Sequence, residues 1–189
     1  MYQICVSGAA KGESVEQGRK LAEAVGEAIA KAGHSLLSGA TTGLPEYAAM
    51  SYKQAKGKTS IGISPAATKV EHVLKYRLPT RPFDGIIYTG LHYIGRDTLL
   101  INSADAVVSI GGRLGTLHEF SIALETQTPV GLLQGAGGVS EYLEDLLKFL
   151  PNIDRSLVIF ETDPVALIEK LTKLLDKLHK PYKSLYKSD

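Results

Sequence analysis

The chain has 189 residues and a mass of 20.3 kDa, which is the size of one ordinary domain. Hydrophobic residues make up 44% and charged residues 22% of the sequence, values that exclude intrinsic disorder. Lysine and arginine number 21 against 20 aspartates and glutamates, so no large basic field is available for a nucleic-acid backbone. The longest apolar runs fall short of the ~18–20 residues that span a bilayer, and we expect no membrane partner.

No basic segment precedes the first apolar run, so we expect no signal peptide and a cytoplasmic protein. Cys5 is the single cysteine, which excludes an internal disulfide and fits a reducing compartment. The histidines show no metal-ligand spacing with acids or with Cys5, and we therefore expect no metal and no cofactor. The informative excess is glycine, with 19 residues, about 10% of the chain against a usual ~7%.

Short apolar runs alternate with longer patterns of helical period. In chain order they predict a strand at Gln3–Ser7, a helix at Ser14–Ala32, a strand at His34–Ser38, a helix at Leu44–Lys56, a strand at Thr59–Ile63, an irregular stretch at Ser64–Arg81, a strand at Gly85–Tyr88, a helix at Tyr93–Ser103, a strand at Ala106–Ile110, a helix at Leu114–Glu125, a strand at Val130–Leu133, a helix at Ser140–Leu150, a strand at Leu157–Phe160 and a helix at Pro164–Leu178.

The strands are almost wholly apolar, as strands buried on both faces are. Their alternation with helices predicts an α/β fold: a single doubly wound, Rossmann-like domain. Its mostly parallel sheet has about seven strands, with helices on both faces. We place the domain at residues 1–179 and expect residues 180–189 to form a loose polar tail.

Ligands of such sheets bind beyond the carboxyl ends of the strands, near the point where strand order reverses. Three loops that follow strands are rich in glycine and small hydroxyl residues, and the third opens directly into a helix. Glycines and a helix N-terminus together offer free N–H groups to a phosphate. Tight turns with glycines for packing alone are the alternative. The expected phosphate- or nucleotide-binding residues are Ser7, Gly8, Gly39, Thr41, Thr42, Gly43, Gly111, Gly112, Arg113, Gly115 and Thr116.

Two charged residues near these loops are candidates for chemistry. Glu119 lies one helical turn after Thr116 and is expected to face the site, where a carboxylate suits a developing positive charge. A favourable interaction with the helix dipole explains it equally well. Arg96 presents a planar fork suited to a phosphate, or is simply a solvated helix residue. Tyr76 and Tyr88, near the irregular stretch, either stack on a base or pack on the surface.

The run from Arg96 to Glu119 resembles the Lonely Guy family of Rossmann-like nucleotide-binding proteins. That family has an Arg-Lys pair followed by P-G-G-x-G-T-x-x-E, where this chain has Arg96-Asp97 and then Gly111 to Glu119 as G-G-R-L-G-T-L-H-E. Residues 38–44 are similar to the family's second glycine-rich loop, and the likeness extends over roughly residues 4–159. Gly111, Arg113 and Asp97 stand where the family has proline, glycine and lysine, as in a divergent branch that includes molybdenum cofactor carriers.

The resemblance implies hydrolysis of a nucleoside 5′-monophosphate to free base and ribose 5-phosphate, with Arg96 and Glu119 as the catalytic pair. The alternative is a carrier or sensor of a nucleotide-like or molybdopterin-type phosphate ligand, without turnover. A DNA-processing role is disfavoured by the balanced charge, so we expect a small-molecule partner and no nucleic acid. The resemblance, and the prevalence of cyclic dimers, also predict a homodimer or higher homo-oligomer formed by the helices of Arg96 and Glu119.

Overall fold

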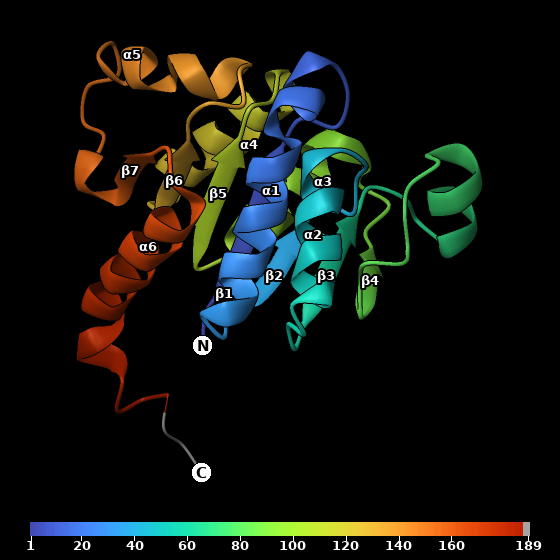
Figure 1. Ribbon diagram of the computed structural model, residues 1–189, viewed down its shortest axis with the longest axis horizontal. Helices are drawn as coiled ribbons and strands as arrows, with labels where there is room; N and C mark the ends of the chain where they lie inside the picture. Colours follow the sequence, from blue (N-terminus) through green and yellow to red (C-terminus); the bar gives the residue numbers. More distant parts are fainter. Residues whose placement is uncertain (187–189) are drawn as a thin grey trace.

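The computed structural model describes residues 1–186 as a seven-stranded sheet with helices on both faces (Figure 1). The strands are β1 (Gln3–Gly8), β2 (Ser35–Ser38), β3 (Ser60–Ser64), β4 (Gly85–Tyr88), β5 (Ala106–Ile110), β6 (Val130–Leu133) and β7 (Val158–Glu161). The helices are α1 (Glu13–Lys31), α2 (Leu44–Gln54), α3 (His92–Asn102), α4 (Leu114–Glu125), α5 (Leu143–Leu147) and α6 (Pro164–His179). None of the described helices is long and apolar enough to cross a membrane.

All strand pairs are parallel, in the order β4-β3-β2-β1-β5-β6-β7. The chain runs outward from β1 to β4 and then returns to place β5 on the other side of β1. The strand order therefore reverses between β1 and β5, which confirms the doubly wound fold and locates its switch point.

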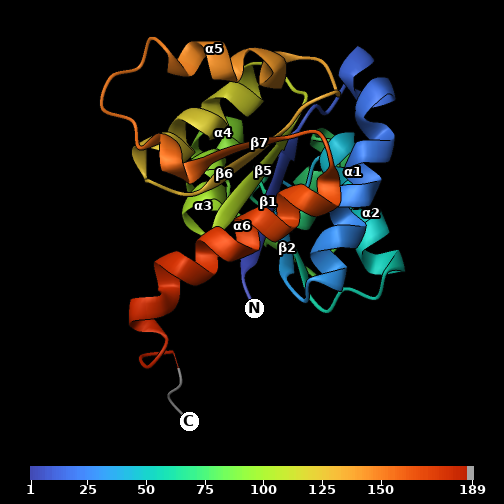
Figure 2. The same cartoon turned by 60° about the vertical axis from the view of Figure 1, so that its left-hand side comes forward.

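Two hydrophobic layers cover the sheet, because alternate residues of each strand point to opposite faces. Ile4 and Val6 pack with the layer of α1, α2 and α6, whereas Cys5 packs with the layer of α3, α4 and α5. Figure 2 shows the sheet between these two groups of helices. The edge strands β4 and β7 are only partly covered, so the expectation of strands buried on both faces holds for the inner five alone.

The predicted helix Ser140–Leu150 is wrong in extent. A 3₁₀ turn covers Val139–Tyr142, and the α-helix proper is only Leu143–Leu147. The N–H groups of Val139 and Ser140 donate to the carbonyl oxygens of Gly112 and Gly111, at 2.9 and 3.2 Å. These bonds hold the segment against the loop after β5, so tertiary contacts override the helical pattern.

The tail is also more ordered than expected. Residues Lys180–Tyr182 form a 3₁₀ turn, and Lys183 pairs with Asp176 at 3.2 Å. The hydroxyl of Tyr186 lies 3.1 Å from Nδ1 of His179. Residues 187–189 of the predicted tail lie outside the described residues.

The irregular stretch between β3 and β4 holds a π-helical turn, Glu71–Lys75. His72 is fully buried and ties this turn to the domain through Ser64 Oγ, 2.8 Å from Nδ1, and through the carbonyl oxygen of Pro79, 2.9 Å from Nε2. Tyr88 packs edge-on against His72, with ring centroids 5.7 Å apart. The stretch is thereby anchored beside the start of α3.

Candidate functional site

A cleft of about 220 Å³ opens at the carboxyl ends of β1, β2 and β5, beside the switch point. This volume is below the ~300–1,000 Å³ of pockets that enclose a drug-sized ligand, so part of such a ligand would stay at the rim. The lining residues are Val6, Ser7, Gly8, Ala9, Ala10, Gly39, Thr41, Pro45, Tyr93, Arg96, Asp97, Arg113, Gly115, Thr116 and Glu119.

The N-terminus of α4 forms one side of the cleft. Gly112 has φ +93°, and a side chain there would overlap Thr116, so glycine is required for the turn from β5 into the helix. Among the described residues no side chain caps α4, which leaves its first N–H groups available to an anion. Gly115 is exposed at this end, and a Cβ added there meets nothing within 4 Å. We call this open N-terminus of α4 the cradle; that it binds a phosphate stays a prediction.

Arg96 lines the cleft and is only 3% exposed. Its Nη1 donates to the carbonyl oxygen of Gly39, which follows β2, and to that of Ile63 in β3, the latter at 2.9 Å. Its Nε lies 3.0 Å from Oδ1 of the buried Asp97. A side chain on Gly39 would overlap the guanidinium, so this glycine makes room for it. Arg96 is therefore a buried tether between strand ends and not a solvated helix residue.

Glu119 points from α4 toward the end of β1, and its Oε2 accepts a hydrogen bond from the Ser7 hydroxyl. Burial raises the pKa of Glu119 to about 7, with the charge of Asp97 acting in the same direction. Arg96, the Ser7 hydrogen bond and His118 act against this shift. At neutral pH the carboxyl group is thus poised between its neutral and charged forms.

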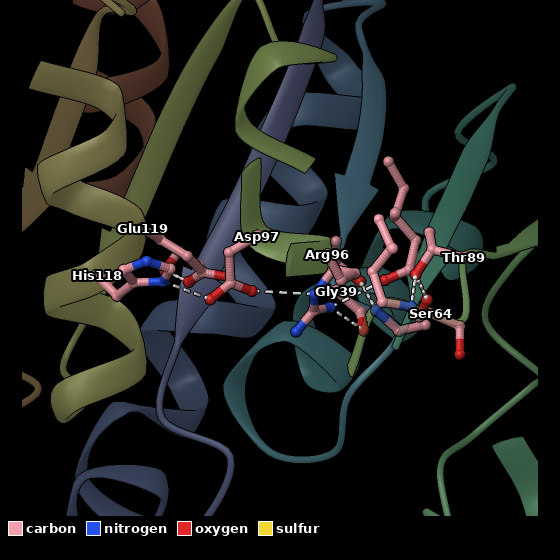
Figure 3. A network of polar contacts seen from close by, with 12 residues as sticks. Gly39, Ser64, Thr89, Arg96, Asp97, His118 and Glu119 are labelled. Carbon is pink, nitrogen blue, oxygen red and sulfur yellow. Dashed lines mark hydrogen bonds and ion pairs between the residues drawn. The ribbon is translucent and has the colours of Figure 1, made fainter. Parts of the chain in front are cut away.

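Asp97 connects the two helices of the site. Its Oδ2 lies 2.9 Å from Nδ1 of His118 in α4, while its Oδ1 faces Arg96 (Figure 3). Asp97 and Glu119 both lie within the reach of one buried guanidinium. The negative charge of Asp97 therefore makes ionisation of its neighbour Glu119 less favourable.

Residues 1–168 match the model of the SLOG cluster4 family. The chain belongs to the SLOG cluster4 family. This family is part of the Rossmann-like SLOG superfamily, and membership in the Lonely Guy family itself stays a prediction. An uncharacterized protein of Archaeoglobus fulgidus is 34% identical over 134 residues, which cover 71% of this chain and 81% of that protein.

Two solved structures resemble this SLOG cluster4 domain over nearly their whole length. The molybdenum cofactor carrier protein of Chlamydomonas reinhardtii is 29% identical, with a TM-score of 0.75 over 92% of this chain and 98% of that one. The molybdenum cofactor binding protein of Rippkaea orientalis is 28% identical, with a TM-score of 0.68 over 94% and 96%.

Most of the predicted site residues of this SLOG cluster4 domain meet at the cleft, and four do not line it. Gly111 and Gly112 are buried in the turn beneath it, where they accept the bonds from the segment before α5. The Thr42 hydroxyl donates to the carbonyl oxygen of Ala10 at 3.3 Å. Gly43 has φ +79° and abuts the carbonyl oxygen of Ala9. These four residues shape the loops beside the cleft, as the packing alternative expects, and their part in ligand binding stays a prediction.

Tyr93, Asp97 and Pro45 also line the cleft, although they were not predicted to be site residues. Arg96 and Asp97 stand three and four residues after Tyr93, so each neighbours Tyr93 along one stripe of α3. This helical spacing was the available signal.

Proposed function

We propose that this protein is a carrier of a phosphate-bearing small molecule of the molybdopterin type, which it holds without turnover. The main support for this proposal is a combination of two features. The N-terminus of α4 is an open cradle, and the nearby Arg96 is already held by two carbonyl groups and by Asp97. The likeness to the two molybdenum cofactor proteins supports the same proposal.

A charged Glu119 carboxylate would repel an anionic ligand, but a protonated carboxyl group would not. Its pKa of about 7 means that it is largely neutral below neutrality. A neutral carboxyl beside the cradle does not repel a phosphate, and a bound phosphate would favour the protonated form further. Binding of the phosphate group would therefore take up a fraction of a proton near pH 7.

Hydrolysis of a nucleoside 5′-monophosphate is the second candidate function. It is favoured by one observation: Arg96 and Glu119, the pair implied by the Lonely Guy resemblance, line the same cleft. A transition state with positive charge at the sugar needs an ionised carboxylate. This candidate therefore predicts a rate that rises with pH through about 7, as Glu119 loses its proton.

The two functions separate in one set of incubations. The purified protein is mixed anaerobically with molybdenum cofactor released from a molybdoenzyme, and molybdenum is measured in the protein peak after gel filtration. In parallel, a panel of nucleoside 5′-monophosphates is assayed for ribose 5-phosphate. Co-eluting molybdenum without ribose 5-phosphate supports the carrier. Release of ribose 5-phosphate, or loss of all molybdenum on filtration, contradicts it.

The cradle itself is tested by Gly115→Val. Because a Cβ at Gly115 meets nothing within 4 Å, the variant should fold like the wild type. Its branched side chain would stand over the N–H groups of the first turn and weaken binding of the molybdenum cofactor at least tenfold, about 1.4 kcal/mol. Gly85→Val is the matched control, since Gly85 lies on the edge strand β4, away from the cleft. Equal affinity of a folded Gly115→Val protein would refute the cradle.

A further inference from the structure

One wall of the cleft is aromatic. Tyr93, in the first turn of α3, lines the cleft together with Gly39 and Arg96, and 46% of its surface stays exposed. The walls around the cradle are otherwise built of small or charged residues. Tyr93 is thus a large apolar surface that the fold leaves uncovered inside its own site.

The ring of Tyr93 is braced from outside the cleft. The ring of Tyr76, from the stretch between β3 and β4, meets it edge-on, with centroids 5.6 Å apart and planes at 79°. The Tyr76 hydroxyl lies 2.8 Å from Nδ1 of His92, the residue before Tyr93. The guanidinium carbon of Arg96 lies 5.9 Å from the centre of the Tyr93 ring. Contacts from two other residues therefore restrict the orientation of Tyr93.

The backbone that presents Tyr93 is itself unusual. His92 has φ +55°, a left-handed conformation that residues other than glycine seldom adopt, and its N–H donates to the carbonyl oxygen of Pro65 at 3.0 Å. Such conformations persist where the surrounding structure imposes them, and they cluster at ligand sites. Here the strained residue opens α3 and sets the position of the tyrosine that follows it.

We propose that Tyr93, braced by Tyr76, is the platform on which the planar heterocycle of the ligand stacks while its phosphate occupies the cradle at α4. The inference rests on the proposed function as a carrier of a phosphate-bearing ligand. It adds the residue that would recognise the ligand's heterocyclic ring. Stacking on an aromatic face tolerates many heterocycles, because each presents a π-face. The small volume of the cleft fits this arrangement, since the ring would lie at the rim against Tyr93 and not in an enclosed pocket.

The test compares probes with and without a ring. Binding of adenosine 5′-monophosphate and of a pterin carrying a phosphate ester is measured by calorimetry beside that of ribose 5-phosphate, which has no heterocycle. Tyr93→Leu should weaken the better-bound ring probe on the order of tenfold and change ribose 5-phosphate less than twofold. Tyr93→Phe, which keeps the ring, should retain most of the affinity. Tyr142→Leu is the control for losing an exposed tyrosine outside the cleft.

The outcomes distinguish the platform from the cradle. If Tyr93→Leu binds all probes as the wild type does, or weakens ribose 5-phosphate equally, the platform is refuted while the carrier proposal stands. If the wild type binds ring probes no better than ribose 5-phosphate, the platform is likewise refuted. If the wild type binds no phosphate probe and no molybdenum cofactor, the proposed function fails and the platform fails with it.

Discussion

Replacing Glu119 by glutamine should stabilise the protein above neutral pH. Glu119 is buried, and its pKa is raised from an ordinary 4.5 to about 7. Glutamine keeps an oxygen for the Ser7 hydroxyl, and Arg96 keeps Asp97 as its ion-pair partner. The substitution therefore removes the cost of a buried charge and preserves the neighbouring contacts.

The pKa shift sets both the size and the sign of the effect. Because the folded state holds the proton more tightly, the wild type loses stability as pH rises from 4.5 to about 7, and the full loss persists above that window. At about 1.4 kcal/mol per pH unit, a shift of this size corresponds to about 3 kcal/mol. Relative to the wild type, Glu119→Gln should be more stable by up to about 3 kcal/mol at pH 8 and nearly equal at pH 4.

Urea unfolding at pH 4, 6 and 8, followed by circular dichroism, measures this difference, because titrating groups remote from Glu119 contribute equally to the wild type and the variant. Glu125→Gln is the control, because Glu125 lies exposed at the end of the same helix. Its effect on the free energy of unfolding should stay small, because the side chain is exposed. The reasoning is refuted if the advantage of Glu119→Gln is the same at pH 4 and 8, or if the variant is the less stable protein at pH 8.

Three further outcomes follow from the packing. Arg96→Met should lower the unfolding free energy by about 3–5 kcal/mol in urea titrations at pH 7, because it leaves Asp97 buried without its cation. A loss under ~1 kcal/mol would contradict a structural role for the Arg96–Asp97 ion pair. Gly26→Ala should cost about 1–3 kcal/mol because its Cβ would overlap the Ala48 carbonyl of α2; a stabilised variant would show that α1 and α2 separate easily. In light scattering, the wild type should have twice the 20.3 kDa chain mass, as the predicted dimer requires. Ile94→Lys places a charge at an exposed apolar position on α3 and should give the mass of one chain. A monomeric wild type would exclude the predicted dimer.

Much of the fold could be predicted from the sequence because its signals are local. The strands at Gly85–Tyr88, Ala106–Ile110 and Val130–Leu133 and the helix at Leu114–Glu125 begin and end as predicted. Each of these strands is an apolar run bounded by glycines or polar turns, and pairing in a parallel sheet preserves that pattern. The segment before α5 was mispredicted because its backbone bonds go to a loop distant in sequence, which no local pattern encodes.

The candidate site was predictable only in part, for a related reason. Glycine-rich turns after strands locate the cleft, since topology brings the strand ends together. Whether a turn glycine faces a ligand or the protein depends on the neighbouring loop, as Gly43 against Ala9 illustrates. The position of Arg96 depends on the carbonyl groups of Gly39, just after β2, and of Ile63 in β3, and the support of Tyr93 depends on Tyr76 in an irregular stretch. These contacts arise only in the folded chain.

The charged residues of the cleft form a framework as much as a reaction centre. Arg96 joins the ends of β2 and β3, and Glu119 joins α4 to β1 through Ser7. Asp97 links the two helices through His118. A framework of this kind fixes the cradle before a ligand arrives, which reduces the ordering cost of binding. Catalysis would require some of these donors to strengthen their bonds to substrate in the transition state, yet the contacts that position Arg96 already occupy part of its hydrogen-bonding capacity. The arrangement therefore suits the proposed carrier better than the second candidate function, hydrolysis.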